Sequence, residues 1–366
     1  MQTTTSWMRN RPRQAITVAC LVLMAISQAR AQEPQEEPLV QAARHVAAGE
    51  HDVALELVRP LAEQGEAGAQ YLLGTLYLRD MGVPRDVDAA LEWIGRAAEQ
   101  DFSPAQVLLA NVYAVGDGVL RDSERATYWY RRAADLGVAE AQNSLGVALG
   151  AGDGVEKNES EAVEWYLRAA EKGYVAAQAN LGFALMQGAG VERDPGQAVV
   201  WLQRAAERGS GWAQYYLGNA YRAGDGVEQD DAMAVTWWRK AAEQGYAYAE
   251  NNLGSMYGRG VGVELDPGRA TYWLARSLAH GNAAAERSLK EVLRLLPEWR
   301  IADATEVRSA PDPGAEVIRV AMVRERAYEL TRGRDWVEIY LPEDHALGYV
   351  PAAALGSVQP FRARPR

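Results

Sequence analysis

A period of 36 residues runs through most of this chain and constrains its fold more than any other feature. Glutamine returns at this interval five times, and a glutamate takes the sixth place: Gln70, Gln106, Gln142, Gln178, Gln214 and Glu250. Six tryptophans keep the same interval: Trp93, Trp129, Trp165, Trp201, Trp237 and Trp273. A fixed period of this size predicts a solenoid, in which one supersecondary unit stacks on the next.

The spacing inside one period predicts a pair of helices. Ala213, Leu217, Ala220 and Tyr221 fall at i, i+4, i+7 and i+8, which is one face of a helix. The Gly-Asp-Gly run at 224–226 interrupts this first helix, and a second begins near residue 230. We call the two helices of each period helix A and helix B.

Several second helices begin with recognisable capping chemistry. Asp194-Pro195 and Asp266-Pro267 each place a carboxylate at the free amides and a proline at the first helical position. Asn158, followed three residues later by Glu161, reads as a capping box with asparagine in place of serine or threonine. Each period is therefore predicted to close as a helical hairpin.

These residues resemble the Sel-1-like repeat, a longer-looped relative of the tetratricopeptide repeat. The pattern A-x-x-x-L-G-x-x-Y-x-x-G-x-G-V, then D-x-x-x-A-x-x-W, then A-A-E-x-G occurs six times between Ala69 and Gly281. Departures are local: Ala110 replaces the glycine of helix A, and Leu149 and Leu185 replace the tyrosine. The resemblance implies a right-handed α-superhelix used for contact with other proteins.

Residues 1–31 are expected to be a secretory signal peptide. Arginines at 9, 11 and 13 precede the apolar run 15–26, and alanines at 29 and 31 fit the two small-residue positions before a cleavage site. The apolar run is short for a transmembrane helix. We therefore expect a periplasmic or secreted bacterial protein without a membrane span; an uncleaved anchor is one alternative. A lipoprotein modified at Cys20 is a second, although Thr17-Val18-Ala19 is a poor lipobox.

The charge of the chain limits its partners. Cleavage after residue 31 would remove the only cysteine, so the processed chain could form no disulfide, and would remove four arginines, which takes the formal net charge from −11 to −15. Residues 300–366 hold ten acidic and ten basic residues, so the negative charge belongs to the repeats. An acidic protein repels nucleic acid and anionic membrane surfaces. We expect no nucleic-acid partner and a preference for a basic protein or peptide.

The chemistry of the chain changes near residue 300, where helical periodicity ends after a proline. The segments 317–320 and 336–341 are rich in β-branched and aromatic residues, and turn-forming runs lie at 310–314 and 332–335. The run V-R-S-A-P, V-I, Y-E-L, D-W-V-E-I and G-Y-V-P resembles a bacterial Src-homology-3 (SH-3-like) barrel. That resemblance implies a small five-stranded barrel, a domain that binds peptidoglycan or peptides in some envelope proteins.

The expected fold is mainly α: an α-solenoid of helical hairpins, then a small all-β SH-3-like barrel. The expected divisions are a signal peptide (1–31), a disordered lead (32–38), a solenoid (39–299), the barrel (300–358) and a basic tail (359–366). Within the solenoid we expect an N-cap hairpin (39–65), six repeats (66–281) and a C-cap helix (282–299), because a stacked array needs capped ends.

The sequence offers no constellation for catalysis, a cofactor or a metal. The four histidines (His45, His51, His280 and His345) lack partners at zinc-motif spacing, and nucleophile-elbow, Walker and Rossmann motifs are absent. The Gly-Asp-Gly loops at Asp117, Asp153 and Asp225 supply one carboxylate each, too few for calcium, so we interpret them as turns. The tryptophans keep a constant phase on helix B, which favours a core between repeats over sugar stacking.

The remaining candidate is a binding surface. The resemblance places helix A on the concave face, where residues that do not repeat could contact a peptide or a partner helix. The groove candidates are Tyr71, Asn111, Phe183, Met186, Tyr215, Asn219 and Arg222. Packing between repeats is the alternative for Leu78, Phe183 and Met186.

We expect a scaffold or adaptor and not an enzyme. Its solenoid would bind a protein partner, and its barrel an envelope component, such as peptidoglycan, or a second partner. A cell-wall-active enzyme, such as a peptidoglycan hydrolase or a β-lactamase, is one alternative. A structural subunit of an envelope polysaccharide-export or secretion complex is another.

Overall fold

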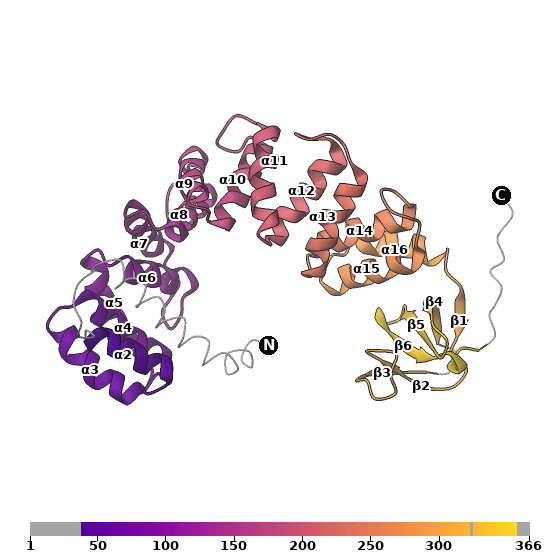
Figure 1. Ribbon diagram of the computed structural model, residues 1–366, viewed down its shortest axis with the longest axis horizontal. Coiled ribbons are helices and arrows are strands. Elements are labelled where there is room, and N and C mark those ends of the chain that lie inside the picture. The colour runs from indigo at the N-terminus through magenta and orange to yellow at the C-terminus, as the bar shows by residue number, and fades with distance from the viewer. Residues whose placement is uncertain (1–37, 323–324, 357–366) are drawn as a thin grey trace. The chain divides into compact units, whose positions relative to one another are not determined.

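The computed structural model describes residues 38–322 and 325–356, and in that range it contains fifteen α-helices followed by a six-stranded sheet (Figure 1). The helices are α2 (Pro38–Ala48), α3 (His51–Glu63), α4 (Ala67–Arg79), α5 (Val87–Glu99), α6 (Ser103–Val115), α7 (Ser123–Asp135), α8 (Ala139–Ala151), α9 (Glu159–Glu171), α10 (Val175–Gln187), α11 (Pro195–Glu207), α12 (Gly211–Ala223), α13 (Asp231–Glu243), α14 (Ala247–Arg259), α15 (Pro267–Ala279) and α16 (Ala285–Leu293). The expected signal peptide, the lead before Pro38 and the basic tail lie outside the described residues.

The expected repeat solenoid is confirmed, and it falls into two compact units. Of the described residues, one unit holds those up to Ala177 together with Ala189–Val191, and the other holds Gln178–Gly188 and those from Glu192 onward. The second unit includes the sheet. The division falls within the fourth repeat, so the second unit holds both repeats and the sheet.

Every helix B of the six repeats begins with a side-chain cap. Asp86, Asp122, Asn158, Asp194, Asp230 and Asp266 each accept a hydrogen bond from the backbone N–H three residues on, at 2.9 to 3.1 Å. These bonds satisfy amides that the first turn of a helix leaves without partners. The caps expected at Asp194, Asp266 and Asn158 are confirmed.

The repeating glutamine ties each hairpin to the one before it. The Gln106 Nε2 donates to the backbone oxygen of Ala98 at 3.0 Å, and Gln70, Gln142 and Gln214 donate to the equivalent oxygens. Glu250 takes this place in the sixth repeat and is fully buried. Its carboxylate lies 3.2 Å from the Arg276 Nε and 2.8 Å from the His280 Nδ1. A buried carboxylate needs such partners, because leaving water is costly for a charge.

The loops between helices A and B also join neighbouring repeats. Gly154 has a φ of +71°, and a Cβ on it would lie 2.0 Å from the backbone oxygen of Ser123 at the start of the preceding helix B. A Cβ on Gly226 would likewise lie 2.1 Å from the backbone oxygen of Pro195. Only glycine permits both this φ and this approach.

The aspartates of the same loops pair with arginines of the preceding loop. Arg85 contacts Asp117 and Arg193 contacts Asp225, each at 2.5 Å, and Arg121 contacts Asp153. We had interpreted these aspartates only as turn residues. Basic residues also recur at the 36-residue period, as Arg85, Arg121, Lys157 and Arg193, and this is the sequence signal that could have revealed the pairing.

The tryptophan ladder is part of the helical core, as predicted. Trp129, Trp165 and Trp237 are buried, and the other three are half-buried. In all six repeats an arginine or lysine three residues later lies over the indole, at 4.1 to 5.2 Å from the ring centre. Such a cation covers the ring face that packing leaves open, and it is attracted by the ring's quadrupole.

The strands form one antiparallel sheet in the order β1-β4-β5-β6-β2-β3. The strands are β1 (Glu298–Arg300), β2 (Thr305–Arg308), β3 (Val317–Ala321), β4 (Arg326–Arg332), β5 (Trp336–Leu341) and β6 (Ala346–Pro351), and a short 3-10 helix, η2, follows at Ala352–Ala354. The resemblance implied five strands. The additional strand, β1, follows Pro297, begins inside the range expected for the C-cap and pairs with β4.

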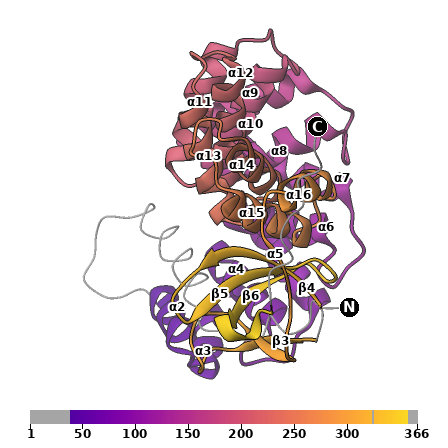
Figure 2. The same ribbon diagram turned by 90° about the vertical axis from the view of Figure 1, so that its right-hand side faces the viewer.

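The sheet packs against the last repeat. Side chains alternate along a strand, so Val337, Ile339 and Leu341 of β5 enter the sheet's own core, while Tyr340 joins the core formed by α13 to α16. Strands β4 and β6 lie beside α15 (Figures 1 and 2). A Cβ on Gly268 of α15 would lie 2.4 Å from the backbone oxygen of Leu330 in β4. The sheet thus occupies the place that the loop of a following repeat would take, and it caps the solenoid.

Candidate functional site

The structure buries two of the expected groove residues. Tyr71 is 4% exposed and packs its ring 5.6 Å from that of Phe102, and Met186 is 7% exposed. Burial also raises the pKa of the Tyr71 hydroxyl. The groove expectation is corrected for these two residues: both pack inside the solenoid, as does Leu78.

The two asparagines among the candidates are held by aromatic residues of helix B. The Oδ1 of Asn111 accepts a hydrogen bond from the hydroxyl of Tyr130 at 2.6 Å. The Oδ1 of Asn219 accepts one from the Trp238 Nε1 at 3.1 Å. These hydrogen bonds join helix A to helix B within each hairpin, and the amide oxygen of each asparagine already accepts a hydrogen bond.

The other candidates lead to a continuous group of aromatic rings. We define the aromatic surface as Phe183 of α10, Trp212, Tyr215 and Tyr216 of α12, and Tyr246 and Tyr248 at the start of α14. The rings follow one another at centroid distances of 4.6 to 6.2 Å. Their mutual angles are tilted or edge-on, the arrangements that aromatic quadrupoles favour.

Helical spacing brings these rings together. Trp212, Tyr215 and Tyr216 stand at i, i+3 and i+4 of α12, so they share one side of that helix. Phe183 and Tyr248 come from the first helices of the preceding and following repeats. Three successive first helices therefore contribute to one surface.

The aromatic surface is accessible and uncharged. Tyr248 is 59% exposed, and the other five side chains are half-buried. Burial is the main cause that raises the pKa of Tyr216 and of Tyr246, and the neighbouring tyrosines raise both pKa values further. Both hydroxyls therefore stay protonated at neutral pH and can donate hydrogen bonds. Arg222, exposed at the end of α12, contacts Asp231 at 3.1 Å.

A hollow lies in the first compact unit. It has a volume of about 240 Å³ and lies among α6, α7 and α8, where Ala114, Tyr130, Asn143 and Val147 line it. Ala114 leaves room for this hollow, because it stands where the first repeat has the larger Leu78. It could accept one side chain of a bound segment.

Four residues of the aromatic surface were missed from the sequence: Trp212, Tyr216, Tyr246 and Tyr248. The groove candidates on helix A include Phe183 and Tyr215 but not these four. The density of aromatic residues between 212 and 248 was the available signal.

Among residues 38–322 and 325–356, the structure contains no group of three or more histidine, cysteine, aspartate or glutamate side chains that could hold a metal ion. In the same part of the chain, no helix is long and apolar enough to cross a membrane.

Comparison with known proteins identifies the repeats. The model of the Sel1 repeat matches six times, at residues 67–102, 103–138, 139–174, 175–210, 213–246 and 247–282. No curated protein matched the chain.

Two solved structures share the fold. One is a protective antigen with an SLR fold from uropathogenic Escherichia coli, which is 38% identical in sequence and has a TM-score of 0.62. The match covers 66% of this chain and 52% of that one. The other is a Sel1 repeat protein from Oxalobacter formigenes, with 33% identity, a TM-score of 0.60, and coverage of 66% and 97%. The chain thus spans about half the length of the Escherichia coli protein.

Proposed function

The chain belongs to the Sel1 repeat family, whose members are scaffolds for protein interactions, and on that premise we propose that its aromatic surface binds an extended, basic segment of a partner protein. The observation that carries this proposal is the unbroken row of six rings across α10, α12 and α14. Tyrosine and tryptophan dominate binding energy at interfaces, because they offer a large contact area with few rotatable bonds.

Two features support a basic partner. The solenoid carries the negative charge of the chain, which attracts cations and speeds their encounter. The protein already stacks arginine or lysine on its own tryptophans, as at Trp165 with Arg168. Arginines of a partner could use Tyr248 in the same way.

We also propose that the protein acts outside the cytoplasm. The arginines and the apolar run of residues 1–31 support this location. N-terminal sequencing of the protein isolated from cells should find Gln32, and an intact Met1 would contradict export.

The expectation that the sheet is an SH-3-like barrel that binds an envelope component stays a prediction. Its six short antiparallel strands are compatible with it. Sedimentation with purified peptidoglycan tests this second contact. A protein that remains in the supernatant would contradict peptidoglycan binding without affecting the aromatic surface.

Position-specific crosslinking tests the main proposal. A photoreactive benzoylphenylalanine replaces Tyr248 in one variant and Tyr128 in another; Tyr128 is a comparably exposed tyrosine on α7, at 53%. We expect a crosslinked partner in envelope extract from position 248 only, with a yield that falls as salt is raised. Equal crosslinking from both positions, or crosslinking from position 128 alone, would contradict the proposal.

A further inference from the structure

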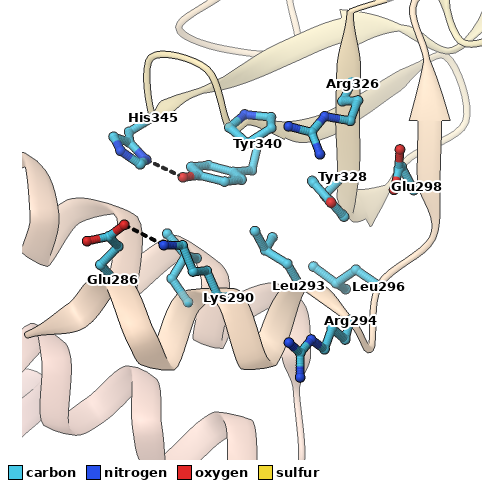
Figure 3. A pocket seen from close by; sticks show the side chains of 12 residues that line it. Glu286, Lys290, Leu293, Arg294, Leu296, Glu298, Arg326, Tyr328, Tyr340 and His345 are labelled. Carbon is cyan, nitrogen blue, oxygen red and sulfur yellow. Dashed lines mark hydrogen bonds and ion pairs between the residues drawn. The ribbon is translucent and has the colours of Figure 1, made fainter.

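A cavity of about 450 Å³ lies between α16 and the sheet, and its lining shares no residue with the aromatic surface (Figure 3). Leu289, Leu293 and Leu296 line it from the helical side, and Tyr328, Tyr340 and Pro342 line it from the sheet. A volume of this size is typical of sites for small organic ligands. The apolar side chains would accept a hydrocarbon chain or ring.

The walls of this cavity are built from the core and are therefore preorganised. Leu289 is 2% exposed and Tyr340 is 1% exposed. The hydroxyl of Tyr340 is hydrogen-bonded to the Nδ1 of His345 at 2.5 Å, which fixes the phenol above the cavity (Figure 3). Strands β4 and β6 contact α15, which supports the sheet beside the cavity.

Among the described residues that line the cavity, the side chains of Arg294 and Arg326 are cations without an ion-pair partner. Lys290 is paired with Glu286 at 2.6 Å on the helical side. Arg326 of β4 is exposed, and within the described part of the chain its side chain forms no hydrogen bond or ion pair. Figure 3 shows its guanidinium extending along the sheet side, above Tyr328, whereas Arg294 points away from the centre.

We propose that this cavity binds an amphipathic carboxylate. The apolar part of the ligand lies between Leu293 and Tyr340, and its carboxylate pairs with Arg326. A guanidinium matches a carboxylate because its fixed N–H groups can donate two parallel hydrogen bonds. Both a fatty acid and the C-terminus of an apolar peptide have this chemistry.

Calorimetric titration of the full chain, as isolated from cells, tests the proposal with two probes. Decanoate represents the fatty acid, and acetyl-Leu-Phe with a free carboxylate represents the peptide end. We expect saturable one-to-one binding of at least one probe, and the probe that binds identifies the source. The corresponding uncharged compounds, decanamide and acetyl-Leu-Phe-amide, should bind at least tenfold more weakly.

Two variants locate the site. Arg326→Gln should weaken binding at least tenfold. Arg287→Gln, on the same α16 but 91% exposed and paired with Glu291, should leave binding unchanged. Hydrogen exchange of the unsubstituted chain provides a second measurement, because a ligand in the cavity should protect α16, β4 and β5. The proposal is overturned if neither probe binds, if the uncharged compounds bind equally well, or if protection appears elsewhere.

Discussion

Gly268 is the residue on which the contact between the solenoid and the sheet depends most sharply. It is the second residue of α15, where alanine would normally stabilise a helix by roughly 0.5–1 kcal/mol relative to glycine. A Cβ there would lie 2.4 Å from the oxygen of Leu330, and real Cβ contacts essentially never fall below 3.0 Å, so β4 must retreat by about 0.6 Å. Overpacking of this kind costs about 1–3 kcal/mol. We therefore expect Gly268→Ala to destabilise the second compact unit by about 1–2 kcal/mol.

Gly196 provides a matched control for this prediction. It holds the same place in α11, also after a capping aspartate and a proline, and a Cβ on it would meet only the cap at 3.4 Å. Gly196→Ala should therefore be neutral or slightly stabilising. Urea unfolding compares the two variants, and hydrogen exchange should show faster exchange in β4 for Gly268→Ala alone. Equal stability and unchanged exchange in both variants would refute the docking of the sheet on α15.

The other predictions concern the first compact unit. Trp165→Ala should lower the free energy of unfolding by about 3–5 kcal/mol, because Trp165 is 6% exposed and Arg168 covers its face. Since repeats couple only to their neighbours, hydrogen exchange should show lost protection near Trp165 with the sheet intact. An unchanged melting temperature would contradict the burial of Trp165. A hydrogen bond from Arg131 lowers the pKa of Glu161. The ionised Glu161 side chain therefore stabilises the folded state above the ordinary glutamate pKa of about 4.3, and this contribution is lost as pH falls through the lowered pKa. Acid unfolding of Glu161→Gln should show a smaller loss of stability across that range, and an identical acid profile would argue against the contact.

The helical hairpins could be predicted because their determinants are local and repeat. Asp194 and Asp266 predict where a helix begins, because each caps an amide only three residues on, and the glycine loops predict where a helix ends. A single period contains all of this information, and six copies reinforce it. The β-branched and aromatic residues within 336–341 likewise located β5 without knowledge of its neighbours.

Contacts between repeats were harder to predict than the repeats themselves. A helical wheel places Tyr71 opposite the core of its own hairpin, yet Phe102 at the start of α6 packs against its ring. A helix in a solenoid has neighbours on several sides, so one apolar stripe does not define everything that is buried. The approach of Leu330 to Gly268 is a long-range contact of the same kind, and no period signals it.

The most direct test of the proposed function is the affinity of the crosslinked partner segment for three forms of the protein. Tyr215→Ala combined with Tyr248→Ala removes two of the six rings, whereas Tyr128→Ala removes an exposed tyrosine outside the aromatic surface. Fluorescence anisotropy should show binding weakened more than tenfold in the double variant and unchanged in the Tyr128 variant, with circular dichroism and melting unchanged in both. Normal binding by the double variant would contradict the claim that the aromatic surface is the site of partner recognition.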